Sequence, residues 1–182
     1  MRPGGELGQL VDAAKAGDRF AFARLVERDA PGAYRAALAV LRSAEDAQDA
    51  TQEATLRAWQ RLPDLREASS WPAWYRRIAV RTAIDMARRR RASGDLLARS
   101  PSAEDEPDPG PAADERMTIL GALARLSADD RAVLGLRFGA DLEVPDLAAT
   151  LGIRLGTAKA RLHRALRRLE TELTKHGEDN EL

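Results

Sequence analysis

The residues best suited to chemistry lie between Leu151 and Glu170, where the sequence reads LGIRLGTAKARLHRALRRLE. This stretch holds six cationic side chains and one acid, although Lys plus Arg and Asp plus Glu balance at 29 each over the whole chain. Guanidinium groups bind phosphates and the O6 and N7 atoms of guanine, and ammonium groups bind phosphates. The stretch therefore predicts contact with nucleic acid. The alternative is a basic helix face that is only solvated.

The spacing of the apolar residues predicts the elements that must position these cations. On a helix over 155–173, one stripe is apolar and the opposite face is basic. The apolar stripe contains Ala158, Leu162, Ala165, Leu166, Leu169 and Leu173. A short amphipathic helix over 144–151 precedes it, and Gly152 and Ile153 form the turn between them. Short helix, turn and longer basic helix are typical of a helix-turn-helix, whose second helix enters the major groove.

The rest of the chain also shows helical spacing, and alternating strand patterns are scarce, so we predict an all-α fold. The predicted helices are 7–16, 19–29, 31–41, 44–62, 71–91, 114–125, 128–138, 144–151 and 155–174, followed by a polar tail. Asp18 and Ser43 are predicted N-caps. Pro31 is predicted to open a separate helix, since proline is favoured in the first turn.

Residues 92–113 read ASGDLLARSPSAEDEPDPGPAA and predict a flexible acidic linker. A segment rich in Pro, Gly, Ser and acids buries too little apolar surface to order itself. Residues 1–91 carry 17 basic against 12 acidic side chains, whereas 92–116 carry 2 against 7. We therefore predict two small helical domains, 7–91 and 114–176, joined by this linker.

Composition excludes several classes of site and of protein. The chain has no cysteine, which excludes disulfides and thiolate metal sites. With only two histidines, a histidine-rich metal centre is not expected. No apolar run approaches the roughly 20 residues that span a bilayer, and the first ten residues lack the apolar core of a signal peptide. We expect a cytoplasmic protein without membrane insertion, metal, cofactor or catalytic residues.

Four segments together resemble a known family. LSADDRAVLGLRF and LEVPDLAATLGIRLGTAKARLHRALRRL are similar to the promoter-reading C-terminal domain of bacterial sigma factors of the small extracytoplasmic-function type. The run from Gly156 to Ala165 is the most specific part. DAQDATQEATLRAWQRL, Asp46 to Leu62, resembles the family's helix for core RNA polymerase, and Ser69 to Arg91 resembles its −10-reading helix. The segments occur in the family's order and cover nearly the whole chain.

The resemblance implies a subunit that binds the largest subunits of core polymerase and reads promoter DNA. The implied −35 contacts are Arg154, Thr157, Lys159, Ala160, Arg161, His163, Arg164 and Arg167. The implied −10 contacts are Leu65, Ser69, Ser70, Arg77, Arg81, Asp85 and Arg88, with the loop 65–70 holding a flipped-out base. The implied polymerase contacts are Asp46, Asp49, Gln52, Glu53, Leu56 and Trp59. The resemblance also implies an anti-sigma factor, around which the linker would let both domains close.

Several residues of these helices have structural alternatives. Trp71, Tyr75 and Ile78 are expected in the core rather than against a base. Leu56 and Trp59 are expected to pack inward or to frame the polymerase contact. The chain differs from the usual family pattern at five positions that bear on base reading: Leu65, Trp71, Arg81, Arg154 and Ala160. We therefore predict no promoter sequence.

Two other functions remain open at this point. A stand-alone helix-turn-helix regulator would bind duplex DNA by itself, usually as a dimer on a two-fold site. It would leave the basic helix 71–91 and the acids of 44–62 without a partner. A nucleic-acid enzyme would need a metal, for which Asp46, Asp49 and Glu53 could supply carboxylates. No phosphate-binding loop or metalloprotease motif supports that reading.

Overall fold

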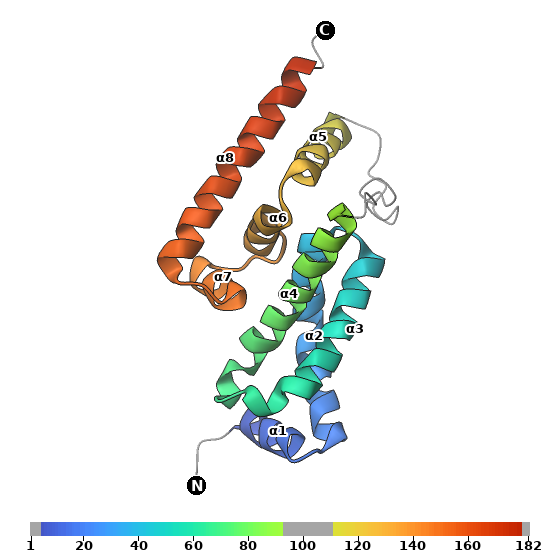
Figure 1. Ribbon diagram of the computed structural model, residues 1–182, viewed down its shortest axis with the longest axis vertical. Helices are drawn as coiled ribbons and strands as arrows, with labels where there is room; N and C mark the ends of the chain where they lie inside the picture. The colour runs from blue at the N-terminus through green and yellow to red at the C-terminus, as the bar shows by residue number, and fades with distance from the viewer. Residues whose placement is uncertain (1–4, 93–110, 180–182) are drawn as a thin grey trace.

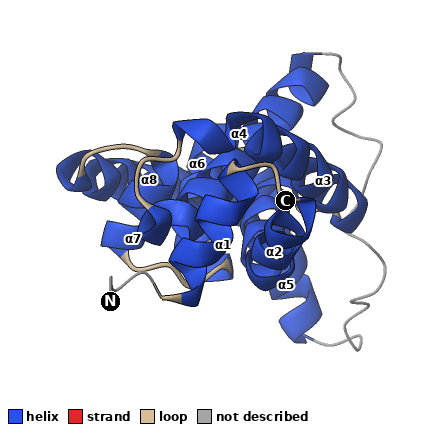
Figure 2. Ribbon diagram, turned by 90° about the horizontal axis from the view of Figure 1, so that it is seen from below, coloured by secondary structure: helices blue, strands red, loops and turns tan. Residues whose placement is uncertain are grey.

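The computed structural model describes residues 5–92 and 111–179, and within these ranges the chain contains only helices, turns and loops (Figures 1 and 2). The elements are α1 (Glu6–Lys15), α2 (Arg19–Leu41), α3 (Ala44–Arg61), α4 (Trp71–Ala92), α5 (Pro111–Arg125), α6 (Ala128–Leu134), α7 (Val144–Leu151) and α8 (Leu155–Asp179). Two 3₁₀ turns, η1 (Leu62–Asp64) and η2 (Ala68–Ser70), join α3 to α4, and a π-helical turn, η5 (Gly135–Gly139), follows α6. The predicted all-α fold is confirmed.

The first helical unit comprises α1 to α4, and its helices begin where the sequence predicts. The Asp18 carboxylate accepts hydrogen bonds from the backbone N–H groups of Phe20 and Ala21, at 2.8 and 3.1 Å. Ser43 Oγ accepts one from Asp46 N–H at 3.3 Å. Each cap satisfies backbone donors that have no partner within the helix.

The prediction that Pro31 separates two helices is wrong, because α2 runs without a break from Arg19 to Leu41. A proline inside a helix removes one backbone hydrogen bond and usually costs about 3 kcal/mol. Buried residues continue on both sides of it, including Leu25, Ala33 and Ala36. Packing of this long apolar face against α3 and α4 offsets the local cost.

The second helical unit comprises α5 to α8. Helix α5 begins at Pro111, three residues before the predicted start, which agrees with the preference for proline in the first helical turn. The predicted helix 128–138 is α6 followed by η5, and α8 extends five residues beyond the predicted 174. Of the predicted linker, residue 92 ends α4 and 111–113 open α5. The remaining residues, 93–110, lie outside the described ranges.

An aromatic cluster fills the end of the first unit nearest α1. Trp71 and Tyr75 are both fully buried and stack with ring centroids 5.2 Å apart. Phe22 contacts Trp59 and Trp71 edge to face, at 4.9 and 5.9 Å. Trp71 Nε1 also donates to the Asp29 carboxylate at 2.9 Å. The predicted core role of Trp71 and Tyr75 is confirmed, so neither ring is available to stack on a base.

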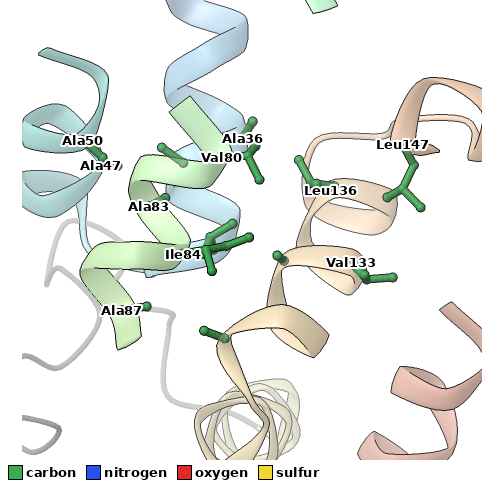
Figure 3. Packing of buried hydrophobic residues seen from close by; sticks show 14 of the residues in the cluster. Ala36, Ala47, Ala50, Val80, Ala83, Ile84, Ala87, Val133, Leu136 and Leu147 are labelled. Carbon is green, nitrogen blue, oxygen red and sulfur yellow. The ribbon is translucent and has the colours of Figure 1, made fainter. Parts of the chain in front are cut away.

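A second apolar cluster crosses from one unit into the other (Figure 3). From the first unit it takes small residues of α2 and α3 and, on α4, Val80 and Ile84. From the second unit it takes Val133, Leu136 and Leu147. All five side chains are at most 9% exposed. The two helical units are therefore packed directly against each other in this structure, through α2 and α4 on one side and α6, η5 and α7 on the other.

Candidate nucleic-acid interface

The turn between α7 and α8 has the geometry that the sequence predicts. Gly152 adopts a left-handed conformation with φ of +67°, which glycine reaches without the steric cost of a Cβ. The N–H groups of Gly152 and Ile153 donate to the carbonyls of Ala149 and Ala148, at 3.2 and 3.0 Å, and so end α7. Helix α8 starts three residues later. Its fully buried Ala158 fixes which side faces the protein.

The opposite side of α8 presents the predicted −35 residues to solvent. Arg154, Thr157, Lys159, Ala160, His163, Arg164 and Arg167 are exposed, and Arg161 is half-buried. Within the described part of the chain, Arg154, Lys159 and Arg167 form no side-chain hydrogen bond or ion pair. The Arg164 guanidinium reaches only the Ala160 carbonyl of its own helix, at 3.4 Å. This basic face is therefore free to bind an anionic ligand.

Arg168 and Leu166 do not follow the division of α8 into a basic and an apolar face. Arg168 turns toward its own unit, where it donates to the Asp130 carboxylate at 2.6 Å. Leu166, predicted on the apolar stripe, is 39% exposed, whereas Ala165 is fully buried. Ala158 and Ala165 lie where α8 contacts α6 and α7. Their small side chains allow the helices to approach closely there, and this contact determines which residues of α8 are buried.

The edge of α4 carries the predicted −10 residues, and the structure divides them into two groups. Arg81 and Asp85 are exposed. Arg77 and Arg88 instead contact the second unit. Arg77 donates from Nε and Nη2 to the Ala149 carbonyl, at 3.0 and 2.6 Å, and Arg88 Nη2 lies 2.6 Å from the Asp129 carboxylate.

These contacts change the electrostatics of both arginines. Partial burial, with a smaller effect from neighbouring Arg81, lowers the pKa of Arg77 from its ordinary value. The hydrogen bond that Arg88 donates to the Asp129 carboxylate raises the pKa of Arg88. Both groups remain cations at neutral pH, because arginine ionises only far above it.

In the loop before α4, the prediction for Leu65 is wrong. Leu65 is 3% exposed and packs in the aromatic cluster, and its carbonyl accepts a hydrogen bond from Lys15 Nζ. Ser69 and Ser70 are exposed, as a base contact requires. Arg66, which lies in the same predicted loop but was not among the implied contacts, is exposed as well. The spacing of Leu62 and Leu65, three apart across a 3₁₀ turn, already indicates that both leucines share a buried side.

The prediction that Asp46 contacts polymerase is also wrong. Its side chain is fully buried, and its carboxylate pairs with the Arg90 guanidinium of α4. The sequence carries a signal for this burial, because Asp46 precedes Ala50, Ala54 and Ala58 at intervals of four, and these three alanines are fully buried. Residues four apart lie on one side of a helix.

The remaining predicted polymerase contacts form a polar surface on α3 with an apolar centre. Asp49, Gln52 and Glu53 are exposed, and Leu56 is 61% exposed, so it does not pack inward. Glu53 also pairs with Arg57 one turn on, at 2.8 Å. Trp59 is half-buried against Phe22 and frames this surface rather than projecting from it.

Among the described residues, no group of three His, Cys, Asp or Glu side chains is placed to hold a metal ion. The three carboxylates considered for magnesium are divided by the burial of Asp46. None of the described helices combines the length and the apolarity needed to cross a bilayer.

Family models match two separate parts of the chain. The model for sigma-70 region 2 matches residues 25–93, which include α3 and α4. The model for sigma-70 region 4 matches residues 116–169, which include α7 and the basic face of α8. The two matches thus contain the surfaces described above.

Curated relatives match over nearly the full length. The ECF RNA polymerase sigma factor SigL of Mycobacterium tuberculosis is 34% identical over 172 residues, which are 92% of this chain and 97% of SigL. SigM of the same species, also an ECF RNA polymerase sigma factor, is 34% identical over 167 residues, covering 88% of this chain and 81% of SigM.

Two solved structures are also similar to this chain over most of its length. CnrH, in complex with the cytosolic domain of CnrY, superposes with a TM-score of 0.63 at 26% identity, covering 91% of this chain and 96% of CnrH. The sigma factor RpoE of Bartonella quintana, in complex with the anti-sigma factor NepR, superposes with a TM-score of 0.57 at 25% identity, covering 84% of this chain and 96% of RpoE.

Proposed function

The chain belongs to the extracytoplasmic-function sigma factors of RNA polymerase, and we propose that α3 binds core polymerase while α4 and α8 read the −10 and −35 elements of promoters. The observation that carries this division is the separation of three surfaces on three helices. A polar surface with an exposed leucine lies on α3, and basic surfaces lie on α4 and α8. The limits proposed for the two functional domains remain 7–91 and 114–176, with 92–113 between them.

The −35 element is proposed to be read as duplex by the free face of α8. The helix follows a short helix and a glycine turn, which is the arrangement that places a recognition helix in the major groove. Arg164 is our candidate for a guanine edge, because its guanidinium reaches only a backbone carbonyl of its own helix in this structure. Lys159 and Arg167 are candidates for phosphates on either side.

The −10 element is proposed to bind as a single strand along the edge of α4. Arg81 supplies a cation there, and Ser69, Ser70 and Arg66 lie on the loop that leads into the helix. Extruding a base from duplex DNA costs a few kcal/mol, which binding of the unpaired strand can offset. The chain would thereby open DNA without catalytic activity of its own.

Core polymerase is proposed to bind α3 through Asp49, Gln52, Glu53 and Leu56. Carboxylates held on a rigid helix suit paired hydrogen bonds with arginines of a basic partner. The exposed Leu56 side chain adds an apolar contact at the centre of the charged surface. Asp46 has no part in this contact.

Control by an anti-sigma factor is proposed from the superposed structures, since RpoE of Bartonella quintana was solved with the anti-sigma factor NepR. We propose that the protein acts in the cytoplasm, where polymerase and promoter DNA are found.

The deciding experiment is in vitro transcription of fragments of the source genome by sigma-free core polymerase, with and without this protein. We expect new start sites that share two spaced upstream elements. The double variant Asp49→Arg with Glu53→Arg should lose core binding and transcription while its circular dichroism stays helical. Asp12→Arg, which changes an exposed acid of α1, is the matched control and should remain active.

Each other outcome identifies a different error. Core binding by the double variant would show that α3 is not the polymerase surface. An absence of new starts together with no complex with core, but with stable binding of duplex DNA by the isolated protein, would support the stand-alone regulator. A stable complex with core that starts no transcription would point to the −10 reader, where Arg81 replaces the residue usual in the family.

A further inference from the structure

The loop that leads into α4, residues 66–70, is held at both ends by buried side chains. Leu65 before it and Trp71 after it are 3% and 0% exposed and belong to the same apolar cluster. Trp71 Nε1 also donates to the Asp29 carboxylate at 2.9 Å. The exposed side chains between these two ends are Arg66, Glu67, Ser69 and Ser70. The loop therefore offers polar groups to a ligand from a base that is packed into the protein.

The backbone at the start of this loop needs a hydrogen-bond donor from elsewhere in the molecule. Leu65 is extended, with φ of −70° and ψ of 110°, and Glu67 is extended as well, with φ of −115° and ψ of 122°. An extended segment cannot satisfy its own carbonyls as a helix does. The Lys15 ammonium, from the last residue of α1, donates to the Leu65 carbonyl across 50 positions of sequence. Helix α1 thus supports the loop directly.

The way α1 ends brings Lys15 to this carbonyl. Gly17 takes a left-handed conformation with φ of +97°, and the N–H groups of Gly17 and Asp18 donate to carbonyls near the end of α1, at 3.0 and 3.1 Å. This arrangement ends a helix sharply and sets the direction of the chain that follows. On the other side of α1, Val11 and Ala14 are buried in the same cluster as Leu65. Helix α1 consequently lies across the end of the first unit where α3 connects to α4 (Figure 1).

We propose that Lys15 is a positioning residue for the −10 element, and that α1 acts through it to hold residues 66–70 in the shape that receives an unpaired base. The inference rests on the proposed function of α4 and its loop. It assigns a role to a helix outside residues 25–93, which the region 2 model matches. Contacts that select a base must be held to within about 0.5 Å by the residues that support them. Without the Lys15 donor, the Leu65 carbonyl can move, and the exposed residues that follow it move as well.

Three variants isolate this hydrogen bond. Lys15→Met keeps an unbranched stem and removes the donor, whereas Lys15→Arg keeps a cationic donor on a long side chain. Arg24→Met is the matched control, because it removes one positive charge and the ion pair that links α2 to Glu6 of α1 at 3.0 Å, but leaves the bond to Leu65 in place. Lys15 and Arg24 are both exposed, so all three variants should remain helical and unfold near the wild-type temperature.

Hydrogen exchange in the free chain measures the loop itself. In the wild type, the Ser70 N–H donates to the Glu67 carbonyl at 3.0 Å. Mass spectrometry of peptides covering 66–70 should show exchange about tenfold faster in Lys15→Met, because the loop opens more often. Lys15→Arg and Arg24→Met should exchange at the wild-type rate. Unchanged exchange in Lys15→Met would overturn the anchoring.

Base selection by the holoenzyme measures the functional consequence. A promoter obtained from the transcription experiment above is randomised over its −10 and −35 elements and transcribed by core polymerase with each variant. At the position of the flipped-out base, the wild type should prefer one base by about tenfold or more. Lys15→Met should keep a preference of less than about threefold there and the full preference at the −35 element. Lys15→Arg and Arg24→Met should retain the wild-type preference at every position.

This pattern separates positioning from stability, because a variant that had only lost stability would transcribe all sequences less. The positioning role is overturned if Lys15→Met keeps the full preference at every −10 position, or loses preference equally at both elements. If Lys15→Met loosens residues 66–70 but the wild-type chain directs no transcription with core polymerase, the anchoring of the loop stands. The proposed sigma function then fails, and the role of Lys15 in base selection fails with it.

Discussion

The basic face of α8 and the basic edge of α4 are both rich in arginine but hold their cations in different states. On α8, Arg154, Lys159 and Arg167 are exposed and, within the described ranges, unpaired. On α4, Arg90 pairs with a buried carboxylate, and Arg77 and Arg88 contact the second unit. The runs RLHRALRR and RRIAVRTAIDMARRRR would suggest two equivalent DNA surfaces. In this structure most cations of the first run are free, whereas in the second run Arg77, Arg88 and Arg90 are paired and Arg81 stays exposed.

The difference shows that a run of arginines does not by itself indicate how many of them are available to a ligand. A helix at the edge of the molecule, such as α8, can place its cations in solvent at little cost. Helix α4 packs against α2, α3, α6 and α7, so part of its positive charge is neutralised by neighbours. The α4 cations therefore contribute to folding stability and to the contact between the two helical units, as well as to the proposed −10 contact.

The largest expected effect is on folding stability, from Arg90→Met. This change removes the Arg90 guanidinium from the buried Asp46 carboxylate and should lower the free energy of unfolding by about 3–5 kcal/mol. Asp46→Asn should cost less, because the Arg90 side chain is 32% exposed and can reach water. Arg167→Met on α8 should change stability by no more than about 0.5 kcal/mol. Urea unfolding followed by circular dichroism measures the stability of all three variants. Equal losses of stability for Arg90→Met and Arg167→Met would contradict the difference proposed between the arginines of α4 and α8.

The next effect is on promoter recognition, from Arg164→Ala. If the guanidinium contacts a base, holoenzyme should lose about 1–3 kcal/mol of binding to duplex −35 DNA, mostly at one position of the element. Folding stability and core binding should not change. Competition binding with single-base variants of the duplex measures this. Loss of core binding by the variant would contradict the proposed role.

A smaller effect is expected in the salt dependence of DNA binding, from Lys159→Ala. Each phosphate contact removed should reduce the slope of log affinity against log salt by about 0.9 on duplex DNA. The loss should be nearly independent of sequence, unlike that for Arg164→Ala. Titrations at several salt concentrations give the slope. An unchanged slope would show that Lys159 does not reach a phosphate.

The smallest effect is expected from Arg168→Ala. Arg168 is 59% exposed, and its partner Asp130 keeps a hydrogen bond from Ser127 Oγ at 2.7 Å. Stability should therefore fall by less than about 1 kcal/mol, and the salt slope should stay unchanged because this arginine faces its own unit. A reduced slope would add Arg168 to the DNA-binding face.

Local sequence signals predicted most of the helices and most of the exposed basic face of α8. Asp18, Ser43 and Gly152 act through backbone groups within a few residues, so their effects could be inferred from neighbours alone. The errors occurred where distant packing competes with a local preference. Pro31 lies inside a helix because the apolar face continues past it, and Leu65 is buried because the loop folds onto the aromatic cluster.

The sequence by itself determined the helical class, the helix-turn-helix and the family, since these follow from spacing, capping and contiguous motifs. Only the tertiary structure decided which charged residues are available. Asp46 and Arg90 lie 44 positions apart, and Arg77 and Ala149 lie 72 apart. Whether such groups meet depends on how the helices pack, and burial among packed helices determines whether a charge binds a partner or supports the fold.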